Sequence, residues 1–185
     1  MKKVILLLLL QSIFIFAGYG SNYQGSYIDK YDLDTGLYYK AILNKNEKSG
    51  FLVSKSNYYT CNINIFNPKN NTSKMIFPSN NQKITNILFE MGYKDNQIIF
   101  NDSFYGHVKN NQNITKRAIK NKILIETYDS EKKETTLWSC SKNGENLTKI
   151  TTFSQKYNWH IDVKNEKIRV IFSKDEQFKI KNFEW

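Results

Sequence analysis

Short apolar runs recur along the chain at intervals of about 8 to 12 residues, separated by residues rich in Asn, Lys, Asp, Ser and Gly. Several runs alternate with a period of two. In one of them Cys61, Ile63 and Ile65 share a face and the intervening asparagines share the other. No segment carries a long apolar pattern with the helical period. The pattern predicts an all-β antiparallel meander, hence a sandwich, barrel or propeller.

The apolar runs also predict where individual elements begin and end. Strands are expected at residues 36–43, 50–55, 59–66, 73–77, 84–91, 96–101, 104–108, 122–127, 135–141, 147–153, 157–163, 167–173 and 177–185, with a further one near 27–33. A single short helix is expected at 115–120. Asn143 and Gly144 lie between two expected strands and predict a type I′ hairpin, because that turn needs positive φ at both central residues.

The first residues have the pattern of an export signal. Met1-Lys2-Lys3 is basic, residues 4–16 are apolar except for Gln11 and Ser12, and small residues follow up to Gly20. The alternative is a membrane anchor, but the apolar run is shorter than the roughly 20 residues that a bilayer requires. We therefore expect a cleaved signal peptide at 1–20 and a single all-β domain at 21–185. The expected location is the bacterial periplasm or the exterior, with no stable membrane insertion after cleavage.

The charge balance bears on the choice of partner. The chain has 185 residues, 27 basic and 17 acidic side chains, and a formal net charge of +10. Arg117 and Arg169 are its arginines and all other basic residues are lysines, which are spread along the chain. Base reading and bidentate phosphate recognition favour arginine, so nucleic acid is not the expected partner. A solvated basic surface is the simplest interpretation, and an acidic protein partner is compatible with it.

Cys61 and Cys140 are the two cysteines of the chain. In an exported protein two cysteines most often form a bridge, so a Cys61–Cys140 disulfide is the default expectation. Such a bridge requires Cα atoms about 5.5 Å apart, which a regular four-bladed ring does not provide for these two positions. A bridge would therefore favour a compact sandwich or a collapsed pair of two-unit halves.

The search for catalytic motifs returns weak candidates. Asp34-Thr35-Gly36 is the triplet of aspartic proteases, but no second copy exists, and an ordinary turn is the expected role. The two histidines, His107 and His160, belong to no zinc-binding pattern. His160 lies beside Trp159 and is expected on an exposed polar face over a core tryptophan. No catalytic residue, cofactor or metal ligand is predicted.

A weak internal repeat leads to a family resemblance. Displacing the chain by about 72 residues places Ile65-Phe66 on Leu137-Trp138 and residues 98–100 on 170–172, which suggests units of about 36 residues. The run LWSCSKNGENLTKIT at 137–151 combines an aromatic-bearing strand, an Asn-Gly turn and a Leu-x-Lys-Ile-Thr strand, and Trp159, Asn165–Ile168 and Phe172-Ser173 follow. This stretch resembles a blade of TolB-like β-propellers, although their Pro-Asp-Gly turn is absent. The resemblance is best over 137–173, and it implies a small or irregular propeller-like domain that binds proteins in the periplasm without catalysis.

Aromatic residues supply the candidate binding surface. Twelve tyrosines, twelve phenylalanines and three tryptophans exceed what one small core needs, and exposed aromatics make good interface anchors. The candidate interface residues are Tyr38, Tyr39, Tyr58, Tyr59, Tyr105, Trp159 and His160. The resulting hypothesis is an exported, non-catalytic protein-binding domain, either an immunity or inhibitor protein that neutralises a toxin or an envelope adaptor. The alternative is a protein that binds or hydrolyses cell-wall glycan, because aromatics that stack on sugars look identical in sequence.

Overall fold

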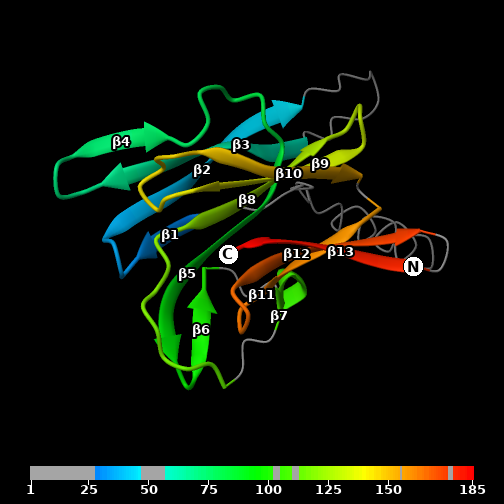
Figure 1. The fold of residues 1–185 in the computed structure, drawn as a ribbon. Helices are drawn as coiled ribbons and strands as arrows, with labels where there is room; N and C mark the ends of the chain where they lie inside the picture. The colour runs from blue at the N-terminus through cyan, green and yellow to red at the C-terminus, as the bar shows by residue number, and fades with distance from the viewer. Residues whose placement is uncertain (1–27, 47–56, 102–104, 110–112, 155, 175–176) are drawn as a thin grey trace, which may run out of the picture.

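A computed structural model describes residues 28–46, 57–101, 105–109, 113–154, 156–174 and 177–185, which form two β-sheets (Figure 1). The larger sheet has nine strands, in the order β1-β2-β3-β5-β8-β9-β10, with β4 paired to β3 and β6 paired to β5. Its strands are β1 (Asp29–Asp32), β2 (Leu37–Asn46), β3 (Asn57–Asn67), β4 (Thr72–Met75), β5 (Ile84–Lys94), β6 (Gln97–Phe100), β8 (Ile123–Asp129), β9 (Glu134–Cys140) and β10 (Thr148–Ser154).

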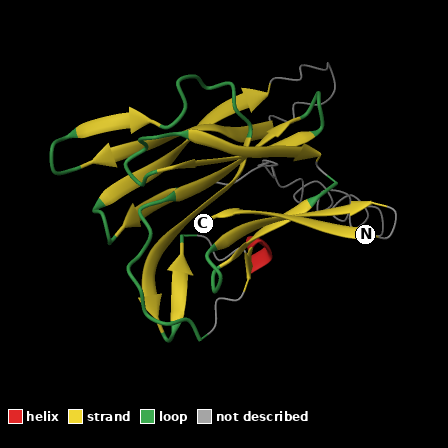
Figure 2. Ribbon diagram, in the orientation of Figure 1, coloured by secondary structure: helices red, strands yellow, loops and turns green. Residues whose placement is uncertain are grey.

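The smaller sheet has four strands in the order β13-β12-β11-β7. They are β7 (Val108–Lys109), β11 (Asn158–Asp162), β12 (Lys167–Lys174) and β13 (Gln177–Glu184). A single turn of 3-10 helix, η2 (Tyr105–His107), precedes β7 and is the one helical element in the described residues (Figure 2). The expected all-β fold is confirmed.

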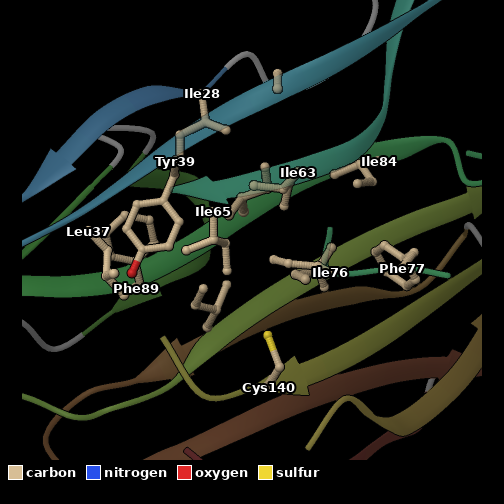
Figure 3. Close-up of a cluster of buried hydrophobic side chains, with 14 residues drawn as sticks. Ile28, Leu37, Tyr39, Ile63, Ile65, Ile76, Phe77, Ile84, Phe89 and Cys140 are labelled. Atoms are coloured by element: carbon tan, nitrogen blue, oxygen red, sulfur yellow. The ribbon is translucent and has the colours of Figure 1, made fainter. Parts of the chain in front are cut away.

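The central strands β5, β8 and β9 each place buried residues on both of their faces. One face of this layer contributes residues such as Phe89 and Cys140 to a core shared with β2 and β3 (Figure 3). The opposite face contributes Leu88, Leu124 and Leu137 to a second core, shared with β11 and β12 of the smaller sheet. Burial on both faces explains why β5 and β8 carry unbroken apolar runs rather than an alternating pattern.

The larger sheet curls until its first strands meet the loop that follows β9. The Tyr39 hydroxyl on β2 donates a hydrogen bond to the carbonyl oxygen of Lys142 at 3.0 Å. The Lys142 ammonium lies 2.9 Å from Asp32 Oδ2 at the end of β1. These contacts close the sheet around the first core, although β1 and β10 lie at opposite ends of the hydrogen-bonded path.

Two buried asparagines continue the hydrogen bonding where strand pairing stops. Asn62 accepts a hydrogen bond from the Phe77 amide at 3.0 Å and donates one to the Phe77 carbonyl at 2.9 Å. Asn101 accepts from the Phe89 amide at 2.7 Å and donates to the Ile87 carbonyl at 3.0 Å. The side-chain amide of each asparagine therefore takes the place of a peptide group in a neighbouring strand. It forms hydrogen bonds with backbone groups that strand pairing leaves without a partner.

The propeller arrangement is not confirmed. The stretch that resembles one blade divides between the sheets, because β9 and β10 belong to the larger sheet and β11 and β12 to the smaller one. A blade would keep these four strands in one sheet. The described strands instead form stacked layers, with β5, β8 and β9 between the two cores.

Three local expectations need correction. Residues 115–120 form no helix; they are irregular, and Arg117 and Lys120 use this conformation to reach Glu90. The turn at Asn143-Gly144 is not type I′, because only Gly144 of the pair has positive φ, within a longer loop that buries Lys142. The strand expected at 104–108 is reduced to β7 after η2. The strand expected at 50–55 lies outside the described residues.

We expect Leu124→Ala to lower the free energy of unfolding by about 2–5 kcal/mol, because it empties a fully buried position between the two sheets. The matched control is Ile99→Ala on β6, whose side chain is 42% exposed and whose loss should cost about 0.5 kcal/mol. Urea unfolding of the wild type and the two variants gives both values. Equal destabilisation by the two changes would contradict the layered arrangement.

Candidate functional site

Three aromatic rings form a row on the exposed face of β1, β2 and β3. Tyr31 is paired with Tyr38, and Tyr38 with Phe66, so the three side chains lie side by side across the strands. Ring centroids are 4.6 Å apart for the first pair and 6.4 Å for the second, with tilted planes. Tyr31 and Tyr38 are 42% and 46% exposed, and Leu33 in the adjacent turn is 79% exposed. We call Tyr31, Leu33, Tyr38 and Phe66 the aromatic face.

The structure separates the other candidate interface residues. Tyr39 and Trp159 are buried core residues and offer no surface, because each points into one of the two clusters. Tyr58, Tyr59 and His160 are half-buried, and Tyr105 lies in η2. Burial lowers the pKa of His160 below its ordinary value. Of the six candidates whose side chains the structure describes, Tyr38 is the one that is exposed, and no local sequence pattern groups Tyr31 and Phe66 with it.

A polar cavity of about 540 Å³ opens near the start of β5 and the β8–β9 turn. Its volume is within the range of small-ligand pockets. Three aromatic residues and several polar groups line it: Tyr59, Asn81, Gln82, Lys83, Thr127, Tyr128, Asp129, Ser130, Glu131, Thr136 and Trp138. Hydrogen bonds from the backbone amides of Lys132 and Glu131 lower the pKa of Asp129, which favours the ionised carboxylate.

The imidazole that stacks on the Trp159 ring is that of His107, from a distant part of the chain. The imidazole of His107 stacks on the Trp159 ring with centroids 4.1 Å apart, and its Nδ1 donates to the Trp159 carbonyl at 2.9 Å. Glu126 Oε2 accepts from Trp159 Nε1 at 2.7 Å and lies 4.0 Å from His107 Nε2. These contacts fix β7 and η2 to the central layer.

Glu90 is a fully buried carboxylate that binds Arg117, Lys120 and Trp185. Its two oxygens accept bidentate hydrogen bonds from Arg117 at 2.6 and 2.7 Å. The Lys120 amide and Trp185 Nε1 donate at 3.0 and 2.8 Å. Burial alone raises the pKa of Glu90, but these hydrogen bonds and the Arg117 charge together lower it below its usual range. These hydrogen bonds therefore attach the irregular segment at residues 115–120, and Trp185, to β5.

Asp34-Thr35-Gly36 forms a turn, as expected. Gly36 has a φ of +75°, a conformation that disfavours any residue with a Cβ, and its amide donates to the Asp32 carbonyl. The turn presents Asp32 and Asp34 to the buried ammonium of Lys142, at 2.9 and 3.0 Å. Sequence inspection could not find this cluster, because the lysine is far away in the chain and no motif marks it.

The expected Cys61–Cys140 disulfide is wrong for this structure, in which both cysteines are free and buried. Cys61 lies on β3 and Cys140 on β9, and β5 and β8 lie between these strands in the sheet. The Cys61 thiol donates to the Ile42 carbonyl at 3.3 Å. Burial raises the pKa of Cys140 to about 12 and also raises that of Cys61, so neither thiol is a nucleophile at neutral pH.

Comparisons were made with protein-family models, with curated proteins and with solved structures. None of them matches this chain. The resemblance to TolB-like propellers therefore stays a prediction. Within the described ranges, no group of three or more His, Cys, Asp or Glu side chains is placed to hold a metal ion. No helix in the same ranges is long and apolar enough to cross a membrane.

Stability should fall at acidic pH through Glu90. The pKa of Glu90 in the folded protein lies below the unfolded value of about 4.3, so its contribution is complete above that value and is lost as the pH falls through the folded pKa. At pH 7 we expect Glu90→Gln to cost about 1.5–3 kcal/mol, because it removes the buried charge that pairs with Arg117, while Arg117 keeps its ion pair with Glu166.

The measurement is urea unfolding of the wild type and Glu90→Gln at a series of pH values from about 7 to 3. The stability difference between the two proteins should shrink toward the acidic end, since protonation removes the same charge in the wild type. A difference that stays constant over the whole series would contradict the role assigned to Glu90.

Proposed function

We propose that this chain is an exported, non-catalytic protein-binding domain that contacts its partner through the aromatic face. The observation that carries the proposal is the row Tyr31–Tyr38–Phe66, three adjacent rings on an open strand surface. Aromatic anchors clustered at the centre of a patch dominate the binding energy of protein interfaces. Tyrosine and phenylalanine also lose little conformational entropy when they are immobilised, because each has two side-chain torsions.

The rigidity of the supporting strands favours recognition without rearrangement. β2 pairs with β1 on one side and with β3 on the other, and its inward-facing residues Leu37, Tyr39 and Ala41 are buried in the first core. The outward-facing rings are therefore held at fixed spacing before a partner arrives. Preorganisation of this kind reduces the entropy cost of association.

The partner best suited to this surface is an acidic protein. The chain carries a formal charge of +10, exposed Lys40 lies two residues from Tyr38 on the same face of β2, and exposed Lys69 lies in the turn between β3 and β4. Complementary charge accelerates encounter and selects against basic partners. Within this proposal, a partner that is a toxin would make the chain an immunity or inhibitor protein, and a component of an envelope complex would make it an adaptor.

A photo-crosslinking amino acid placed at Tyr38 tests the interface in cells that make the protein. We expect one acidic protein to be captured from position 38 and not from the same amino acid at Ile99, an equally exposed position on β6. Capture should fall about tenfold or more when Tyr31 and Phe66 are replaced by Ala, and it should weaken with added salt. Mass spectrometry identifies the partner and separates inhibitor from adaptor. Equal capture from both positions, or none from either, would contradict the proposal.

The polar cavity supports a second candidate, the binding of cell-wall glycan. Tyr59, Tyr128 and Trp138 provide faces for sugar rings, and the other lining groups are hydrogen-bonding side chains. The lowered pKa of Asp129 favours binding over hydrolysis, since a glycosidase acid needs a raised one.

Titration with soluble peptidoglycan fragments, followed by tryptophan fluorescence, tests this candidate. If it is correct, the signal should saturate in the wild type and in Tyr38→Ala, and Tyr128→Ala should weaken binding about tenfold or more. The absence of saturable binding to the wild type at millimolar fragment would eliminate it.

A further inference from the structure

Lys142 is the one lysine in the described part of the chain whose side chain is fully buried. Its backbone is held on both sides. Its amide donates to Asn121 Oδ1 at 3.0 Å, and its carbonyl accepts from the Tyr39 hydroxyl at 3.0 Å. The side chain is therefore aimed at a fixed point, and its Nζ lies 5.9 Å from the centre of the Phe89 ring.

Two carboxyl groups meet this amine. Nζ lies 2.9 Å from Oδ2 of Asp32, which is fully buried, and 3.0 Å from Oδ2 of Asp34, whose side chain is 44% exposed. The other contacts of Asp32 are donors: the Thr35 hydroxyl to Oδ2 at 2.8 Å and the Asp34 amide to Oδ1 at 3.2 Å. The cluster thus places an amine, a carboxyl group and a second carboxylate together in a site from which water is largely excluded.

We propose that Lys142 and Asp32 condense to an intramolecular isopeptide bond. Transfer of a proton along the hydrogen bond from Nζ to Asp32 Oδ2 converts the ion pair into a neutral amine and a carboxylic acid. Nζ then attacks Cγ of Asp32, and the C–N bond forms as the C–Oδ2 bond breaks. The products are one amide and one water molecule, so the reaction needs no oxidant, reductant or further reactant.

Asp34 moves the proton in this reaction. Its carboxylate accepts a proton from Nζ as the C–N bond forms and delivers it to the departing hydroxyl group, which leaves as water. The Asp34 amide, 3.2 Å from Asp32 Oδ1, stabilises the negative charge that develops on that oxygen in the tetrahedral intermediate. The fold holds the amine and the carboxyl group in contact, so the reaction needs no encounter in solution. Such positioning greatly lowers the activation barrier of intramolecular reactions.

Burial explains why Asp32 rather than Asp34 is the acylated residue. Both oxygens of Asp32 have donors and neither faces solvent, whereas Asp34 remains accessible to water that can carry protons. The product would join the end of β1 covalently to the loop that follows β9. It would make permanent the closure of the larger sheet that the ion pair and the Tyr39 hydrogen bond already hold.

Tryptic mapping of the purified folded protein tests the proposal. An amide on Nζ blocks cleavage after Lys142, so residues 134–149 should appear as one peptide, linked to residues 31–40 and lighter than the sum by one water. Lys142→Met and Asp32→Ala should abolish the linked peptide. Asp34→Asn should fold, as judged by circular dichroism, and form the link at least tenfold more slowly.

The ion pair of Lys167 with Glu184 on the surface provides the control within the same digest. It also joins a lysine to a carboxylate, but it is exposed and lacks the second carboxylate, so its peptides should carry unmodified masses. Recovery of separate, unmodified peptides 31–40, 134–142 and 143–149 from the folded wild type would overturn the proposal and leave a buried ion pair only. A linked peptide that forms at an undiminished rate in Asp34→Asn would overturn the role given to Asp34. Neither outcome depends on what the aromatic face binds.

Discussion

The fold depends on a layer of three strands, β5, β8 and β9, that contributes apolar residues to a core on each of its two faces. A sheet with one wet face needs one covering layer, whereas this one needs two, and the chain supplies them from its two ends. Strands β1 to β3 curl over one face and the smaller sheet covers the other. The aromatic face lies on the outer side of β1 to β3, and the Lys142 cluster lies where the larger sheet closes. The cavity lies at the β8–β9 turn and is lined in part by β8 and β9 themselves.

Buried polar side chains attach the covering layers to the central strands through their hydrogen bonds. Glu90 binds the irregular segment and Trp185, while Glu126 binds Trp159 and, through it, the smaller sheet. Asn62 and Asn101 complete backbone ladders. In a protein rich in Asn and Lys, these few side chains have a structural use that their composition alone does not suggest. Buried polar contacts of this kind specify one arrangement, because any other would leave charges or amides unpaired.

The buried titratable side chains are also held by their surroundings. Both thiols are protonated in the core, His107 is stacked and hydrogen-bonded, and Glu90 is enclosed by donors. In the described part of the chain, the aromatic face and the polar cavity are the two surfaces for which binding is proposed. Where an amine and a carboxyl group do meet in a dry site, at Lys142 and Asp32, the chemistry that the geometry favours joins the chain to itself.

The sequence by itself determined the all-β class, most strand positions and the turn at Asp34-Thr35-Gly36, because period-two alternation and turn residues are local signals. It also identified Tyr38 as a surface candidate. Only the tertiary structure decided that β9 and β10 separate from β11 and β12, that Tyr39 and Trp159 are buried, and that Cys61 and Cys140 are kept apart. It alone brought Lys142 to Asp32. Strand order and the choice of which apolar face packs on which depend on contacts between residues far apart in the chain, and a local pattern is the same whichever partner a strand acquires.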